Sequence, residues 1–114
     1  MAYKQALGRW GEDRAVRWYR RHGFQVLDRN WRCSRGELDV IAQRGSVVVV
    51  CEVKTRSSLA FGFPAEAVGP DKQRRIRRLA AEWLAEQGRK GPVQIRFDVA
   101  EVVGREIRVI EAAF

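Results

Sequence analysis

Two acidic residues and a lysine in the middle of the chain have the types and spacing of a catalytic set. Asp39 lies in the largely apolar stretch Gly36–Ala42, and Glu52 and Lys54 end a valine run that begins at Val47. Valine runs bounded by glycine are typical of β-strands, so two strands joined by a tight turn are predicted. Charges at the end of such a strand cost free energy unless they are paired, solvated in a cleft or bound to a metal.

The turn decides which of these side chains share a face. A two-residue loop at Arg44–Gly45 would place Asp39 opposite Val50 and Glu37 opposite Glu52. Asp39 would then be diagonal to Glu52 on one face, whereas a register slip of one residue would separate them. Side chains alternate along a strand. We therefore expect one face to carry Glu37, Asp39, Glu52 and Lys54, and the other to carry Leu38, Val40, Val49, Cys51 and Val53.

This arrangement predicts a divalent metal site. Neighbouring carboxylates repel each other, a cation removes the repulsion, and hard oxygen ligands suit Mg²⁺ or Mn²⁺. The predicted ligands are the carboxylates of Asp39 and Glu52 and the backbone carbonyl of Val53. Lys54 would orient an attacking water or stabilise charge on the phosphorane, and Glu12 would be an accessory ligand, directly or through water. The alternatives are an ion pair between Glu52 and Lys54, and a surface Glu12 paired with an arginine.

The remaining pattern predicts the elements that position these residues. Apolar residues at helical spacing predict helices over about Lys4–Arg21 and from Pro70 or Asp71 to Gln87. The glycine at 23 is a plausible cap of the first helix. Alternation predicts three more strands, and a basic turn is expected over 30–36 and a short helical turn at Pro64. The predicted strands are Phe24–Trp31, Gly36–Ala42, Val47–Lys54, Val93–Val103 and Glu106–Ile110.

The order α-β-β-β-α-β-β has a helix long enough for a crossover between parallel strands. We therefore expect one α/β domain over residues 1–114, with a mixed sheet and flanking helices. The net charge is +8, with 22 lysines and arginines, which favours a polyanionic partner such as nucleic acid. A solvated basic surface is the alternative. No apolar run approaches the roughly 20 residues of a membrane span, and no signal segment or disulfide framework is expected, so a cytoplasmic location is predicted.

Several motifs together are specific enough to indicate a family. They are Gly36-Glu37-Leu38-Asp39, Glu52-Val53-Lys54-Thr55-Arg56, Phe61-Gly62-Phe63-Pro64-Ala65-Glu66-Ala67-Val68, Lys72 and Arg96-Phe97-Asp98. This set resembles the YraN family of bacterial proteins over nearly the whole chain. That family is similar to Holliday-junction resolvases and to the restriction-endonuclease-like PD-(D/E)xK nucleases. Leu38 stands where the superfamily name has proline, which removes no ligand.

The resemblance implies a restriction-endonuclease-like fold, with Asp39, Glu52 and Lys54 as the catalytic set and Glu12 as an accessory acid. The expected activity is Mg²⁺- or Mn²⁺-dependent cleavage of DNA, with branched or structured DNA as a candidate substrate. A homodimer would fit a two-fold junction. A non-catalytic nucleic-acid-binding module and a protein-interaction domain are the alternatives.

Basic and aromatic side chains near the motifs are candidates for contacts with nucleic acid. Phosphate contacts position a substrate without reading its sequence. Trp31 and Phe61 are candidates for stacking on an unpaired base, although aromatic side chains are more often buried. The candidate phosphate-binding residues are Arg32, Arg35, Arg56, Lys72, Arg74 and Arg75, with Arg78 beside them.

Overall fold

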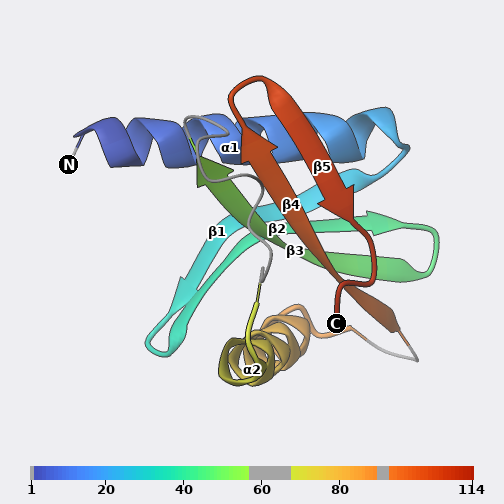
Figure 1. Ribbon diagram of the computed structural model, residues 1–114. Helices are drawn as coiled ribbons and strands as arrows, with labels where there is room; N and C mark the ends of the chain where they lie inside the picture. The colour runs from blue at the N-terminus through green and yellow to red at the C-terminus, as the bar shows by residue number, and fades with distance from the viewer. Residues whose placement is uncertain (1, 57–67, 90–92) are drawn as a thin grey trace.

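The computed structural model describes residues 2–56, 68–89 and 93–114 (Figure 1). Within these residues the predicted order α-β-β-β-α-β-β is confirmed. The short helical turn predicted at Pro64 lies outside the described residues. No helix in the described part of the chain is long and apolar enough to cross a membrane. The elements are α1 (Ala2–Arg21), β1 (Gln25–Cys33), β2 (Gly36–Arg44), β3 (Val47–Arg56), α2 (Pro70–Glu86), β4 (Gln94–Val103) and β5 (Glu106–Ile110).

The strands form one mixed sheet in the order β1-β2-β3-β4-β5. Neighbours are antiparallel except β3 and β4, which run parallel from the pair Val47–Gln94 to the pair Arg56–Val103. Parallel neighbours need a long connection, and the segment containing α2 supplies it, as predicted. This arrangement matches the restriction-endonuclease-like fold expected from the sequence.

The two helices cover opposite faces of the sheet (Figure 1). Alternate residues of β3 explain this arrangement. Val48 and Val50 pack in the cluster that contains α2, whereas Val49 and Cys51 pack in the cluster that contains α1. A strand buried on both faces needs such a continuous apolar run. The central strands are therefore buried on both faces, and their ends beyond the apolar run carry the charged residues.

The loop between β2 and β3 is Gly45–Ser46, so the predicted loop at Arg44–Gly45 was wrong. Arg44 pairs with Val47, and Ile41, not Asp39, pairs with Val50. Glycine followed by serine is a favoured sequence for a two-residue hairpin turn, and Gly45 has a φ of 59°, which glycine adopts at little cost. The register moves by two residues, an even number, so the side chains between Val40 and Cys51 stay on their predicted faces.

Leu38 is an exception to that alternation. It packs in the α2 cluster with Ile41, although it was predicted on the face of Val40. The pairing of β2 with β3 ends at Val40 and Cys51. Beyond that pair, the side chains of β2 no longer alternate strictly between the two faces. The basic turn predicted over 30–36 is also shorter than expected. β1 continues to Cys33 and leaves a two-residue turn before β2.

Candidate functional site

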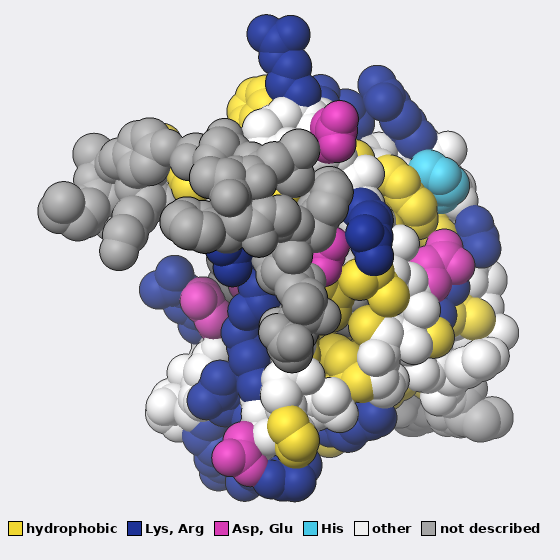
Figure 2. Space-filling view, in the orientation of Figure 1, with side chains coloured by type: hydrophobic (Ala, Val, Ile, Leu, Met, Phe, Trp, Pro, Cys, Tyr) yellow, Lys and Arg dark blue, Asp and Glu magenta, His cyan; other side chains and the backbone are white. Residues whose placement is uncertain are grey.

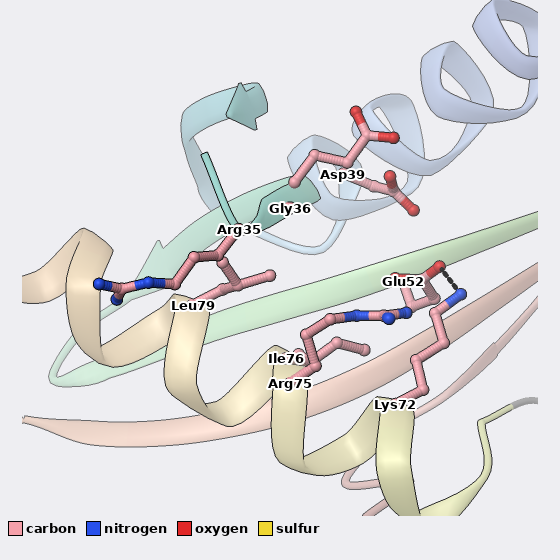
Figure 3. A pocket seen from close by; sticks show the side chains of 9 residues that line it. Arg35, Gly36, Asp39, Glu52, Lys72, Arg75, Ile76 and Leu79 are labelled. Carbon is pink, nitrogen blue, oxygen red and sulfur yellow. Dashed lines mark ion pairs between the residues drawn. The ribbon is translucent and has the colours of Figure 1, made fainter. Parts of the chain in front are cut away.

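A pocket of about 250 Å³ lies between the ends of β2 and β3 and the first turns of α2 (Figure 3). Asp39 comes from β2, Glu52 from β3, and Lys72 and Arg75 from α2. Asp39 and Glu52, predicted to share one face, both line this pocket. Its lining is Arg35, Gly36, Glu37, Asp39, Glu52, Lys72, Arg75, Ile76 and Leu79.

Asp39 is the most perturbed acid of the pocket. Its Oδ2 accepts a hydrogen bond of 2.8 Å from the backbone N–H of Val53. Burial raises the pKa of Asp39 to about 7, and the charge of Glu52 acts in the same direction, followed by those of Glu12 and Glu37. The hydrogen bond from Val53 opposes this shift. Asp39 is therefore a buried carboxylate with other acids around it, and a cation bound there would stabilise its charged form.

Glu52 has two lysine partners in the folded protein. Its Oε1 lies 2.8 Å from Nζ of Lys72 and 3.9 Å from Nζ of Lys54. Lys54 follows on the same strand, whereas Lys72 reaches Glu52 from α2 (Figure 3). The closer cation is thus the one supplied by the helix across the pocket.

The two lysines respond differently to this environment. Burial lowers the pKa of Lys54, and the neighbouring Lys72 lowers it further. Burial also acts to lower the pKa of Lys72, but its hydrogen bonds to Glu52 and Lys54, with the charges of Glu52 and Asp39, raise it overall. Lys72 is therefore the firmly charged partner, and Lys54 is the lysine whose proton is more easily removed.

The donor set of the pocket fits a hard divalent cation. Two carboxylates from neighbouring strands converge, and the crowding of negative charge at Asp39 is what a cation would relieve. Val53 follows Glu52 in the chain, and its backbone N–H donates to Asp39. Its carbonyl is the predicted third ligand. Within the described ranges, no cluster of three or more His, Cys, Asp or Glu side chains could hold a metal. Protein ligands would therefore be few, as Mg²⁺ sites allow.

Glu12 lies beside this pocket and does not line it. Its Oε1 accepts a hydrogen bond of 2.9 Å from Nδ2 of Asn30 and lies 3.9 Å from Nη2 of Arg29. Glu12 and Asn30 line an adjoining pocket that shares Glu37 with the first. The predicted accessory acid therefore acts on Asp39 through its charge, and the alternative of pairing with an arginine is also realised.

Three of the predicted phosphate-binding residues line the pocket, namely Arg35, Lys72 and Arg75, whereas Arg56 is exposed at the end of β3. Three arginines already have carboxylate partners: Arg32 with Glu37 at 3.1 Å, Arg35 with Glu82, and Arg74 with Asp71. Lysine and arginine side chains gather over α2 in Figure 2.

The predicted aromatic stacking residues do not contribute to the described site. Trp31 is buried beneath α2, and its Nε1 donates a hydrogen bond of 3.2 Å to Oε1 of Glu86. It therefore belongs to the core and is not presented to an unpaired base. Phe61 lies outside the described residues.

Two features of the site were missed from the sequence. Lys72 was predicted to contact a phosphate, but in the folded protein it forms an ion pair with Glu52, 20 positions earlier. Asn30, which holds Glu12, carried no signal except that asparagine tolerates the left-handed backbone (φ 52°) found there. Contacts between distant elements leave no local pattern in a single sequence.

Fold and site together define an α/β protein in which two carboxylates from neighbouring strands lie beside two lysines. The chain matches the model of "Uncharacterised protein family UPF0102" over residues 11–102 and belongs to that family, the YraN family. This confirms the predicted family.

Relatives with the same description align along most of their lengths. The protein from Beutenbergia cavernae is 52% identical over 103 residues, which cover 90% of this chain and 86% of the relative. The protein from Frankia casuarinae is 54% identical over 99 residues, covering 87% and 83%. The protein from Nocardia farcinica is 55% identical over 101 residues, covering 88% and 78%.

Proposed function

We propose that this protein is a Mg²⁺- or Mn²⁺-dependent nuclease that hydrolyses DNA phosphodiesters, with branched or structured DNA as the substrate class. The observation that carries the proposal is the convergence of Asp39, Glu52 and Lys72 on one pocket beside a basic helix, with Nζ of Lys54 3.9 Å from Glu52. A homodimer would suit this role, because a four-way junction has two-fold character. A cytoplasmic location would also suit it.

Each residue has a distinct part in the proposed reaction. Asp39 and Glu52 would hold the cation, with Val53 contributing its carbonyl. A bound divalent cation would neutralise the scissile phosphate and lower the pKa of its water. Lys54, whose pKa is lowered, is suited to orient the attacking water and exchange a proton with it. Glu12 adds negative charge that favours cation binding at Asp39.

A non-catalytic nucleic-acid-binding module is the second candidate. The pairing of Glu52 with Lys72 favours it, because a neutralised glutamate can be a structural ion pair on a basic surface. Both candidates bind DNA through the basic side of the molecule. They differ in the role of Asp39 and Glu52. A nuclease needs both carboxylates to cleave DNA, whereas a binding module does not cleave DNA at all.

Cleavage of labelled branched, duplex and single-stranded DNA in Mg²⁺ or Mn²⁺ separates the candidates. The wild type should cut at least one substrate, and Asp39→Ala and Glu52→Ala should lose about three orders of magnitude in rate or more while still binding DNA. Glu106→Gln, an exposed carboxylate on β5, is the matched control and should cut normally. DNA binding by the wild type without cutting in either metal would refute the nuclease proposal.

A further inference from the structure

We propose that Lys72 is a positioning residue that exchanges partners: it holds Glu52 in the free protein and moves to a substrate phosphate when DNA binds, which frees Glu52 for the metal. The inference rests on the proposed nuclease function and adds regulation of the same site. In this scheme the two carboxylates bind the metal more tightly when DNA is present.

The contact between Lys72 and Glu52 is the tightest ion pair of the pocket. Nζ of Lys72 lies 2.8 Å from Oε1 of Glu52, against 3.9 Å for Lys54. The side chains of Lys72 and Glu52 are 31% and 13% exposed, so water screens the pair only in part. Lys72 is therefore the principal counter-ion of Glu52 in the free protein.

A lysine at this distance competes with a metal for Glu52. An ammonium group in contact with a carboxylate oxygen neutralises the charge that attracts a cation, and it repels a divalent ion brought to the same oxygen. Asp39 has no ion pair with a lysine or arginine within the described residues. Its carboxylate accepts a hydrogen bond from the backbone N–H of Val53. Metal binding is thus opposed at Glu52, and Lys72 is the residue that opposes it.

The position of Lys72 on α2 makes a phosphate its natural second partner. Lys72 is in the first turn of α2, where the helix dipole favours anions. Arg75, one turn later, lines the same pocket and extends toward Glu52 in Figure 3, with no carboxylate partner in the described part of the chain. A DNA phosphate entering between these cations would gain two charged donors. The flexible lysine stem can follow it away from Glu52.

The exchange predicts positive coupling between DNA and metal. A phosphate that withdraws Lys72 raises the affinity of the carboxylates for metal, and by linkage the metal raises the affinity for DNA by the same factor. Without Lys72, Glu52 would already be available to the metal. DNA would then change the affinity for metal very little. This loss of coupling is not expected from a lysine that only stabilises the fold.

Calorimetric titration of the full-length protein with Mn²⁺ tests the exchange. In the absence of DNA, Lys72→Met should bind Mn²⁺ about tenfold more tightly than the wild type, because the competing charge is gone. Lys72→Arg, which keeps the charge, should resemble the wild type. Arg20→Met removes one charge from α1, on the opposite face of the sheet, and it should leave Mn²⁺ affinity unchanged. Lys72→Gln and thermal melting check that the effect is not one of folding.

A second titration includes a DNA duplex with nuclease-resistant phosphorothioate linkages. The duplex should tighten Mn²⁺ binding to the wild type and change it little for Lys72→Met. Equal or weaker Mn²⁺ binding by Lys72→Met, with binding abolished by Glu52→Gln, would overturn the exchange and leave the nuclease proposal standing. No Mn²⁺ binding by any variant, with or without the duplex, would overturn both.

Discussion

Asp39 is the side chain of the site whose charged form is most strongly disfavoured in the folded protein. Burial and the charges of Glu52, Glu12 and Glu37 raise its pKa to about 7, against an ordinary value of 3.8. Proteins commonly accept such a cost where a carboxylate has a function, because a structural role would be served by a neutral group. The hydrogen bond from Val53 keeps the carboxylate at the pocket despite this cost.

Replacement of Asp39 should therefore stabilise the metal-free protein in a pH-dependent way. Because the folded-state pKa lies above the unfolded value, the folded protein holds the extra proton between about pH 4 and 7, and stability is lost as pH rises through that window. Asp39→Asn can still accept from Val53 and carries no charge. In urea unfolding it should be more stable than the wild type by about 1–2 kcal/mol at pH 8 and similar at pH 4. A difference that is independent of pH would contradict the assignment.

At the scale of elements, close packing and one buried acid position the helix α1. Asp98 on β4 is fully buried and accepts hydrogen bonds from the Tyr19 hydroxyl on α1 at 2.6 Å, from Arg96 at 2.9 Å and from the backbone N–H of Ala112 at 2.9 Å. Burial raises the pKa of Tyr19, so its hydroxyl stays a donor. Asp98, the last residue of the motif Arg96-Phe97-Asp98, thus connects α1, β4 and the segment after β5.

Gly11 allows α1 to approach β3 beside the site. A Cβ at this position would collide with the side chain of Thr55, which follows Lys54, whereas a Cβ at Gly8 would meet no atom within 4 Å. Glu12 is the next residue, so the approach also sets its distance from Asp39. The two glycines, one turn apart in the same helix, form a natural pair of test positions.

Alanine substitutions at these glycines should have opposite effects on the free energy of unfolding. Gly8→Ala should stabilise the protein by about 0.5–1 kcal/mol, because alanine favours a helix. Gly11→Ala gains the same propensity but must displace Thr55 or the helix, and a net loss of about 1–3 kcal/mol is expected. Denaturant unfolding of both variants measures this. Equal stabilisation by the two substitutions would show that α1 does not pack on β3 as described.

At the scale of the molecule, positive charge dominates and lies beside the pocket. The net charge is +8, and basic side chains crowd α2 in Figure 2. A second hollow of about 530 Å³ along α2 continues from the pocket, shares Arg35 and Arg75 with it, and also contains Arg78. This surface offers a path for a DNA backbone leading to Asp39 and Glu52.

The salt dependence of DNA affinity should locate that path. Each phosphate contact adds about one to the slope of log affinity against log salt concentration, so Arg75→Ala should weaken binding and reduce the slope by about 1. Arg20→Ala removes the same charge from α1, on the opposite face of the sheet, and should leave the slope unchanged. Equal slopes for both variants would indicate attraction by overall charge without a defined path.

The local sequence by itself determined the elements, their order and the pairing of acids with a lysine, because alternation, helical periodicity and valine runs are properties of neighbouring residues. It also predicted that Asp39 and Glu52 come together, because they lie on neighbouring strands joined by a two-residue turn. Only the tertiary structure decided the register, the face of Leu38, the burial of Asp98 and the contact of Lys72 with Glu52. These depend on turn conformation and on side chains meeting across the sheet, where long-range packing, not local pattern, sets the distances.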